Sequence, residues 1–183
     1  MYCMSRKIRC IYIDGIDKAG KTSVVREMRK YLKNKELDLH EMNGTDDNKL
    51  KLQNILLEDN SNSVILKENS VLSLFQDDVK KGLSIFSVGD NYRELLRKEQ
   101  DINHKYGSVH FFLIPESMSI PAERFKELPD IFGLLDSYNF FKNINNYSVS
   151  QGLDIKLIFF NEDDKIFDVR DQILNIIEKD YRI

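Results

Sequence analysis

Apolar residues gather along the chain in short continuous runs, and most of the segments between these runs repeat apolar residues at helical spacing. A short apolar run bounded by turn residues is typical of a buried strand, whereas apolar positions three and four residues apart indicate one face of a helix. Residues 37–42 instead alternate apolar and polar side chains and stop at Asn43-Gly44, as a half-buried strand does. The pattern predicts strands at 9–14, 37–42, 64–66, 109–114 and 154–160.

Helices are predicted between these strands. The first spans residues 21–33 and places Val24, Met28 and Leu32 on one face. Further helical segments are predicted at 46–58, 71–81, 91–106, 131–144 and 166–179, whereas the polar stretch 116–129, with its two prolines, is either a loop or a short helix. Strands that alternate with helices favour a parallel sheet of about five strands covered on both faces, which is a three-layer α/β/α sandwich.

The chemistry concentrates at the junction of the first strand and the first helix. Gly15 to Thr22 matches G-x-x-x-x-G-K-[ST], the Walker A phosphate-binding loop, without a mismatch. The glycines let the backbone approach phosphate oxygens, Lys21 adds a positive charge near the β and γ phosphates, and the Thr22 hydroxyl is a ligand for Mg²⁺. The motif predicts a P-loop NTPase-type fold that binds ATP and Mg²⁺. The expected ATP contacts are Gly15, Asp17, Lys18, Ala19, Gly20, Lys21, Thr22 and Ser23.

Length and composition restrict the classes of protein that the chain can form. With 183 residues, of which 42% are hydrophobic, one domain spanning 1–183 is expected. The formal net charge of −3 argues against tight nonspecific binding to nucleic acid. Cys3 and Cys10 are the only two cysteines, which favours a reducing compartment. No apolar run approaches the roughly 18 residues of a membrane span, and the first residues lack a signal-peptide pattern, so we expect a cytoplasmic protein without membrane contact.

The loop and its flanks resemble the thymidylate kinase family of P-loop nucleoside monophosphate kinases. That family writes its loop as E-G-[LI]-D-x-[AS]-G-K-[ST], and residues 14–22 reproduce it almost throughout. The inner aspartate is specific to the family and faces the sugar of the acceptor nucleotide, so the resemblance implies this role for Asp17. The alternative for Asp17 is that it stiffens the loop through local hydrogen bonds. Residues 40–45 stand where the family has R-E-P-G-G-T, which implies an acceptor contact for Glu41.

The resemblance also concerns the charges around the transferred phosphate. Family members carry a basic residue either on a lid or in the P-loop itself. The lid is predicted here at 116–130, where Arg124 and Lys126 are the basic residues. Arg124 is therefore expected near ATP, and Lys18 is expected to share the stabilisation of the transferring group. The alternative for Lys18 is a solvated loop lysine.

The family motif D-R-Y-x-x-S, which follows the third strand, has an incomplete counterpart. Residues 68–73 keep the acid and the final serine but lack the arginine. The resemblance implies Glu68 beside Mg²⁺ and Ser73 beside the acceptor, while a surface carboxylate is an equally good interpretation of Glu68. A rival register at Asp90 also lacks the arginine, and a helix cap explains Asp90 better than a metal ligand does.

These observations predict an ATP- and Mg²⁺-dependent kinase of nucleotide biosynthesis that phosphorylates a nucleoside monophosphate, with a thymidylate-type deoxynucleotide as acceptor. The expected catalytic residues are Asp17, Lys18, Lys21 and Glu68. Two alternatives stay open. One is a deoxynucleoside kinase, whose E-R-S motif residues 68–70 resemble without the arginine, and the other is a nucleotide-binding module that has lost catalysis. The expected partners are nucleotide substrates, and because family members often form homodimers, the resemblance implies that state as well.

Overall fold

A computed structural model describes all five predicted strands and three of the predicted helices. The described residues are 6–16, 19–35, 37–42, 63–70, 90–116, 139, 152–161 and 163–183, and for 38, 40–42, 90–93 and 95 only the backbone is described. The helices predicted at 46–58, 71–81 and 131–144 and the lid predicted at 116–130 lie outside these residues, apart from Glu116 and Asn139.

The centre of the fold is a sheet of five parallel strands, as the sequence predicts. The strands are β2 (Cys10–Gly15), β3 (Asp38–Met42), β4 (Ser63–Glu68), β5 (Ser108–Pro115) and β6 (Ile155–Phe160), in the order β3-β4-β2-β5-β6. Because β2 is central, the loop that follows it starts between the carboxyl ends of β4 and β5. In register, Ile13 of β2 lies opposite Glu68 on one side and Phe111 on the other.

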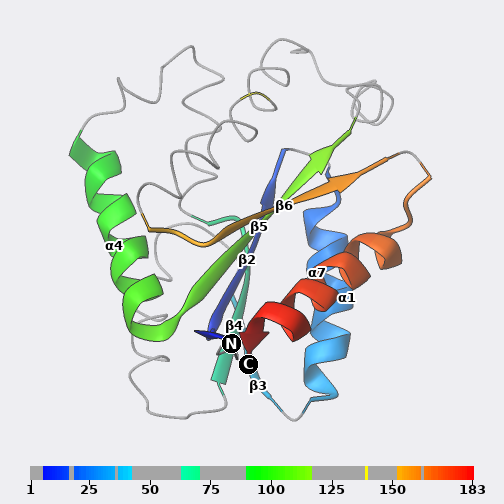
Figure 1. The fold of residues 1–183 in the computed structure, drawn as a ribbon, viewed down its shortest axis with the longest axis horizontal. Coiled ribbons are helices and arrows are strands. Elements are labelled where there is room, and N and C mark those ends of the chain that lie inside the picture. The colour runs from blue at the N-terminus through cyan, green and yellow to red at the C-terminus, as the bar shows by residue number, and fades with distance from the viewer. Residues whose placement is uncertain are drawn as a thin grey trace, which may run out of the picture.

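Helices cover both faces of this sheet. The helices α1 (Lys21–Lys33) and α7 (Ile166–Asp180) pack on one face, and α4 (Asp90–Tyr106) lies on the other (Figure 1). The predicted apolar stripe of α1 is confirmed, since Val24, Met28 and Leu32 are fully buried in the core with the inward side chains of β2 and β5. The three layers therefore form the α/β/α sandwich of a P-loop NTPase-type fold. No described helix is long and apolar enough to cross a membrane.

The sheet face under α4 carries a different set of side chains. A small hydrophobic cluster lies on this face and consists of Cys10, Tyr12, Ile65 and Ile102. Beside it, the charged or polar side chains of Lys67, Glu99 and His110 are also buried. The two faces of β2 therefore differ, because alternate residues of a strand point to opposite faces: Ile11 and Ile13 face the apolar core, whereas Tyr12 and Asp14 face the polar layer under α4.

The strand after Ser61-Asn62 is longer than the sequence predicts. The apolar run predicts residues 64–66, but β4 extends over Ser63–Glu68. The extra residues are polar, so hydropathy does not mark them as part of a strand. They pair nonetheless, since Lys67 lies opposite Tyr12 and Met42 in the register of the sheet. This extension carries Glu68 to the end of the sheet at which β2 enters its loop.

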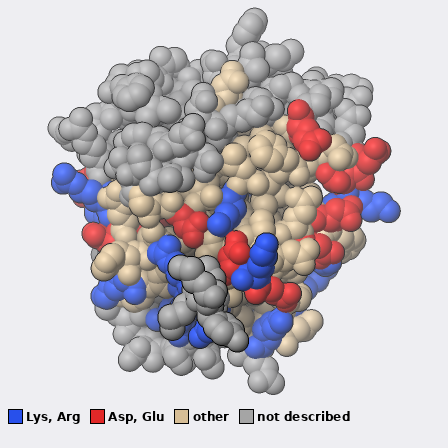
Figure 2. Space-filling view, in the orientation of Figure 1, with Lys and Arg blue, Asp and Glu red and all other residues tan. Residues whose placement is uncertain are grey.

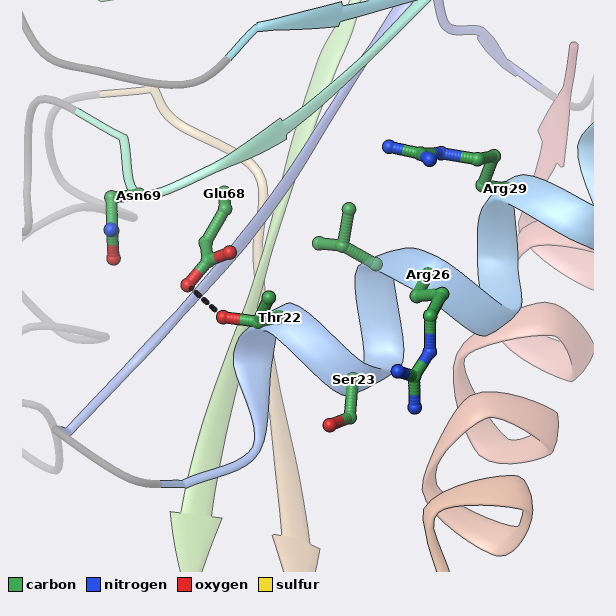
Figure 3. A pocket seen from close by; sticks show the side chains of 7 residues that line it. Thr22, Ser23, Arg26, Arg29, Glu68 and Asn69 are labelled. Atoms are coloured by element: carbon green, nitrogen blue, oxygen red, sulfur yellow. Dashed lines mark hydrogen bonds between the residues drawn. The ribbon is translucent and has the colours of Figure 1, made fainter.

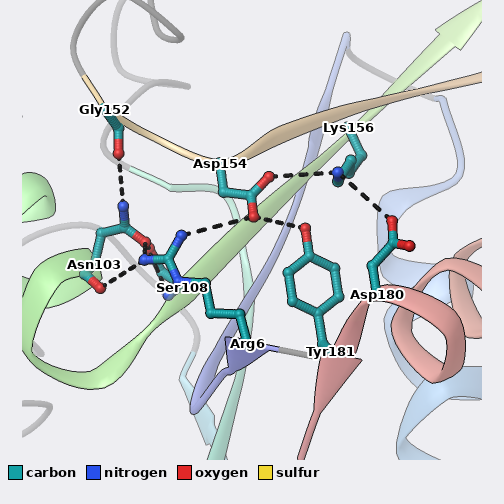
Figure 4. A network of polar contacts seen from close by, with 8 residues as sticks. All are labelled: Arg6, Asn103, Ser108, Gly152, Asp154, Lys156, Asp180 and Tyr181. Carbon is teal, nitrogen blue, oxygen red and sulfur yellow. Dashed lines mark hydrogen bonds and ion pairs between the residues drawn. The ribbon is translucent and has the colours of Figure 1, made fainter. Parts of the chain in front are cut away.

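A second sheet joins the two ends of the described chain. The two-residue strands β1 (Arg6–Lys7) and β7 (Tyr181–Arg182) pair in parallel, and no hydrophobic pattern predicts them. Polar contacts surround this pair (Figure 4). The Tyr181 hydroxyl donates to Asp154 Oδ2 at 2.7 Å, Arg6 lies 3.8 Å from the same carboxylate, and Arg6 also donates to Asn103 Oδ1 at 2.8 Å. The ends of the described chain are thus tied to Asp154, the residue before β6, and to Asn103 of α4.

Acidic and basic side chains are interleaved on the face of the molecule that Figure 2 views. Examples are the pairs of Lys156 with Asp154 and Asp180, at 3.6 and 3.7 Å. Such interleaving agrees with the small formal net charge of −3.

Candidate functional site

The phosphate-binding loop leaves β2 at Gly15, which has a φ of 139°. A Cβ atom built at Gly15 would lie 2.6 Å from the Leu113 carbonyl oxygen of β5. The sequence predicts that this glycine admits phosphate oxygens, and the structure adds a second requirement, because the adjacent strand leaves no room for a Cβ atom. Glycine is therefore required at this position for strand packing. Gly20, with a φ of 90°, is the residue that turns the chain into α1.

The first turn of α1 has the composition of an anion-binding helix start. Gly20 is the N-cap residue and supplies no side-chain hydrogen bond, and the turn contains no acidic residue. The first N–H groups of a helix have no partner within the helix, and the helix dipole makes this end positive. Ala19 is buried and its N–H donates to Ile16 O at 3.2 Å, which shapes the loop in front of the helix. Such an end binds phosphate.

Lys21 lies directly over this loop. Its side chain is 8% exposed, and Nζ donates to the carbonyl oxygens of Gly15 and Ile16, each at 2.9 Å. The ammonium group is thus held against the backbone of the loop that would receive the phosphates. Lys21 is the residue that the Walker A motif assigns to phosphate.

The structure brings Thr22 and Glu68 together although 46 residues separate them. The Thr22 hydroxyl, in the first turn of α1, donates to Glu68 Oε1 at 2.8 Å from the end of β4 (Figure 3). Oxygen ligands of this kind suit Mg²⁺, which usually keeps several waters and takes one or two carboxylates from the protein. The pair therefore fits the predicted Mg²⁺ position. Within the described residues, no group of three His, Cys, Asp or Glu side chains could hold a metal ion.

A pocket of about 470 Å³ opens beside this pair. Seven residues line it: Thr22, Ser23, Val25, Arg26, Arg29, Glu68 and Asn69. Figure 3 shows the arginines Arg26 and Arg29 on the same helix as Thr22. Sequence reasoning missed both arginines, although positions 22, 26 and 29 have the spacing of one helix face. The pocket is thus lined both by the candidate metal ligands and by two cationic side chains.

Several predicted site residues cannot be placed. Asp17, Lys18, Ser73 and Arg124 lie outside the described residues. Glu41 is in β3, where its backbone lies opposite Leu66, and its side chain is not described. The roles assigned to these five residues by resemblance stay predictions. Asp90 is the first residue of α4, which agrees with a position at the helix start.

Sequence reasoning also missed a buried polar array under the site. Asp14 and His110 are fully buried, and Asp14 Oδ2 lies 3.5 Å from His110 Nδ1. On the other side of the ring, Nε2 lies 4.0 Å from Glu99 Oε2 of α4. The His110 ring stacks on Tyr12 with centroids 4.4 Å apart. Burial raises the pKa of the Glu99 carboxyl and raises the pKa of the Tyr12 phenol. No motif signals this array, because its members come from three separate elements.

The parallel sheet, its central β2 and the loop that follows define a P-loop NTPase-type fold, and comparison with solved structures agrees. Thymidylate kinase from Ehrlichia chaffeensis is similar with a TM-score of 0.57 and 12% identity, over 94% of this chain and 99% of that one. The YorR protein of Bacillus subtilis, solved in complex with phosphorylated GDP, has a TM-score of 0.59 and 17% identity, over 92% and 95%. Thymidylate kinase from Candida albicans has a TM-score of 0.55 and 15% identity, over 94% and 92%.

These likenesses establish the fold. No protein-family model matches the chain, and a search of curated proteins finds no match. At 12% to 17% identity, the activity has to be inferred from the site itself.

Proposed function

We propose that the protein transfers a phosphoryl group from ATP, with Mg²⁺, to a nucleoside monophosphate. The observation that carries this proposal is the pairing of Thr22 with Glu68 at 2.8 Å, immediately beside the phosphate-binding loop. A glycine turn that bound no nucleotide would have no need of a carboxylate delivered from the neighbouring strand to the second residue of the helix. Phosphoryl transfer depends on such positioning and on charge stabilisation, because little covalent chemistry is left to the protein.

The chain's own residues divide the work. The first turn of α1 binds the phosphates of the donor through its N–H groups, and Lys21 adds a fixed positive charge. Thr22 and Glu68 would hold Mg²⁺, which when bound neutralises charge on the phosphate oxygens. Arg26 and Arg29 line the adjoining pocket and make it favourable for an anionic second substrate.

The finer assignment is a thymidylate-type acceptor, which would make the reaction dTMP + ATP to dTDP + ADP. It rests on the resemblance of the loop, above all on Asp17. The solved thymidylate kinases share the fold with this chain, and that likeness is consistent with the assignment.

A panel assay tests the proposal. The protein is incubated with ATP, Mg²⁺ and each common nucleoside and nucleoside monophosphate, and the products are separated by chromatography. We expect one or more monophosphates, dTMP first, to gain a phosphate. Phosphorylation of nucleosides alone would identify a deoxynucleoside kinase instead. Binding of ATP without formation of ADP in any mixture would identify a nucleotide-binding module.

The role of Asp17 is tested with one substitution and one altered acceptor. If Asp17 accepts a hydrogen bond from the sugar hydroxyl, Asp17→Asn should leave ATP binding intact and weaken the acceptor about tenfold or more. An acceptor without that hydroxyl should be poor for the wild type and lose little further in the variant. Equal damage to ATP binding and acceptor use would instead assign Asp17 to the stiffness of the loop.

A further inference from the structure

The turn that follows β4 is fastened to the strand that precedes the phosphate-binding loop. The Asn69 N–H donates to Ile13 O at 3.1 Å, and the Ser70 N–H donates to Asp14 Oδ1 at 2.6 Å. Asn69 has a φ of 63° and is the one non-glycine residue with a positive φ among those that the structure describes. After Glu68 the backbone therefore adopts a left-handed conformation at Asn69, and two hydrogen bonds to acceptors on β2 hold this turn in place.

We propose that Asp14 is a positioning residue, which fixes the turn of residues 68–70 so that the Glu68 carboxylate faces Thr22. The inference rests on the proposed function in one respect, namely that Glu68 and Thr22 hold Mg²⁺. No hydrogen bond or ion pair described for Asp14 or Thr22 joins the two residues. Asp14 acts through the backbone of Ser70, which lies two residues beyond Glu68. The Glu68 carboxylate accepts the hydrogen bond from the Thr22 hydroxyl at 2.8 Å.

The Asp14 carboxylate is itself well suited to hold a fixed direction. It is fully buried, and its second oxygen, Oδ2, lies 3.5 Å from His110 Nδ1 of β5. The His110 ring is kept in place by stacking on Tyr12, with an angle of 14° between the ring planes. One oxygen of Asp14 therefore faces the neighbouring strand while the other accepts the Ser70 N–H.

Burial of an acid at this position calls for such an explanation. A buried carboxylate lowers stability unless its hydrogen bonds and charge partners compensate for the lost water. On the opposite face of β2 the side chains of Ile11 and Ile13 are buried without any polar contact to maintain. Asp14 differs from these neighbours in its two polar contacts, which are the approach of His110 Nδ1 at 3.5 Å and the hydrogen bond from the turn that carries Glu68.

The test compares binding of ATP with Mg²⁺ to binding in EDTA, measured by calorimetry. In Asp14→Ala we expect the gain in affinity that Mg²⁺ provides to fall about tenfold, with affinity in EDTA within about twofold of the wild type. Glu68→Gln should show the same pattern, and the double variant should lose no more than Glu68→Gln alone, because both act at one point. Asp14→Asn, which keeps an oxygen for the Ser70 N–H, should recover most of the gain. Tyr12→Phe, on the same strand face, is the matched control.

The turn can also be tested without altering β2. Asn69→Gly keeps the left-handed conformation without strain, whereas Asn69→Val opposes it, and both remove the amide side chain. We expect the glycine variant to keep the Mg²⁺ gain and the valine variant to lose it as Asp14→Ala does. This pair decides the matter if Asp14→Ala does not fold.

Amide hydrogen exchange separates failure of this inference from failure of the proposed function. Without nucleotide, Asp14→Ala should speed exchange of the Ser70 amide about tenfold or more, and Tyr12→Phe should not. If the Ser70 amide exchanges faster in Asp14→Ala but Mg²⁺ does not change the affinity of the wild type for ATP, the proposed metal site is overturned. The role of Asp14 in holding the turn would then stand. Unchanged exchange in Asp14→Ala, or losses of the Mg²⁺ gain that multiply in the double variant, would overturn the role of Asp14.

Discussion

At the scale of single residues, Lys21 is held in place by the loop that it would serve. Its ammonium donates to two loop carbonyls and is shielded from solvent, so the charge is placed by the fold and needs little reorganisation when phosphate binds. The sequence motif indicates that Lys21 contacts phosphate, but it gives no sign that the same side chain braces the loop. Loss of Lys21 should therefore affect both chemistry and stability.

We expect Lys21→Ala to reduce phosphoryl transfer at least about a hundredfold, because a fixed charge aimed at the transferring group is lost. The free energy of unfolding should fall by about 1 kcal/mol as the two hydrogen bonds disappear. Turnover and denaturant unfolding measure the two effects. Lys33→Ala, at the exposed last turn of the same helix, is the control. Undiminished turnover in Lys21→Ala would remove the phosphate-binding role of the loop.

A second prediction at this scale concerns Glu99. Burial raises its pKa above the ordinary 4.5, although the charges of His110 and Lys67 work in the opposite direction. The folded protein therefore keeps the Glu99 proton to a higher pH than the unfolded chain. The contribution of Glu99 to the free energy of unfolding should fall as pH rises from about 4.5 through the native pKa.

Glu99→Gln has no proton to lose, so its Tm relative to the wild type should rise with pH across this window. Thermal unfolding at a series of pH values measures the difference. Glu94→Gln, an exposed position on the same helix, supplies the control. Parallel curves for Glu99→Gln and the wild type would show that the buried carboxyl keeps its ordinary pKa.

At the scale of elements, the fit of β2 against β5 depends on Gly15. Gly15→Ala must accommodate both a positive φ and a Cβ atom 2.6 Å from the Leu113 carbonyl oxygen. Gly152 has a positive φ of 75° but no atom within 4 Å of an added Cβ. We expect Gly152→Ala to cost about 1 kcal/mol of unfolding free energy from backbone strain alone, and Gly15→Ala to cost clearly more. Equal losses in denaturant unfolding would mean that the strands can separate without cost.

The elements that the sequence predicts are those with a strong hydrophobic pattern. The helix of residues 21–33 and the strand of 109–114 carry enough apolar residues in a regular spacing to be recognised, and both are confirmed. The residue pairs that build the site could not be predicted in this way. Asp14 and Ser70 are 56 residues apart, and their contact depends on the order of the strands, which no local pattern contains. The short strands β1 and β7 are polar and only two residues long, so they leave no periodic trace.

At the scale of the whole molecule, strand order converts distant residues into one site. Because β4 is the neighbour of β2, the end of β4 delivers Glu68 to the first turn of α1. The Walker A motif could be read from the sequence because its residues are consecutive. The resemblance implies that Glu68 lies beside Mg²⁺, with a surface carboxylate as the equal alternative. The hydrogen bond from Thr22 is consistent with the metal-side position, which stays a prediction. The arginines of the pocket and the buried array required the packed structure.

Because Cys10 is buried, the rate at which its thiol is alkylated reports how often the central strand becomes exposed. The Cys10 side chain is fully buried on β2, and burial raises the pKa of its thiol, so an alkylating reagent reaches it only in molecules whose sheet has opened. In a Cys3→Ser background, mass spectrometry should find Cys10 alkylated at least about a thousandfold more slowly than in the unfolded chain. A nucleotide that binds only the folded protein should slow alkylation of Cys10 further, by a factor of one plus the ratio of the free ligand concentration to Kd. Alkylation at the rate of a free thiol would show that the strand is open in solution.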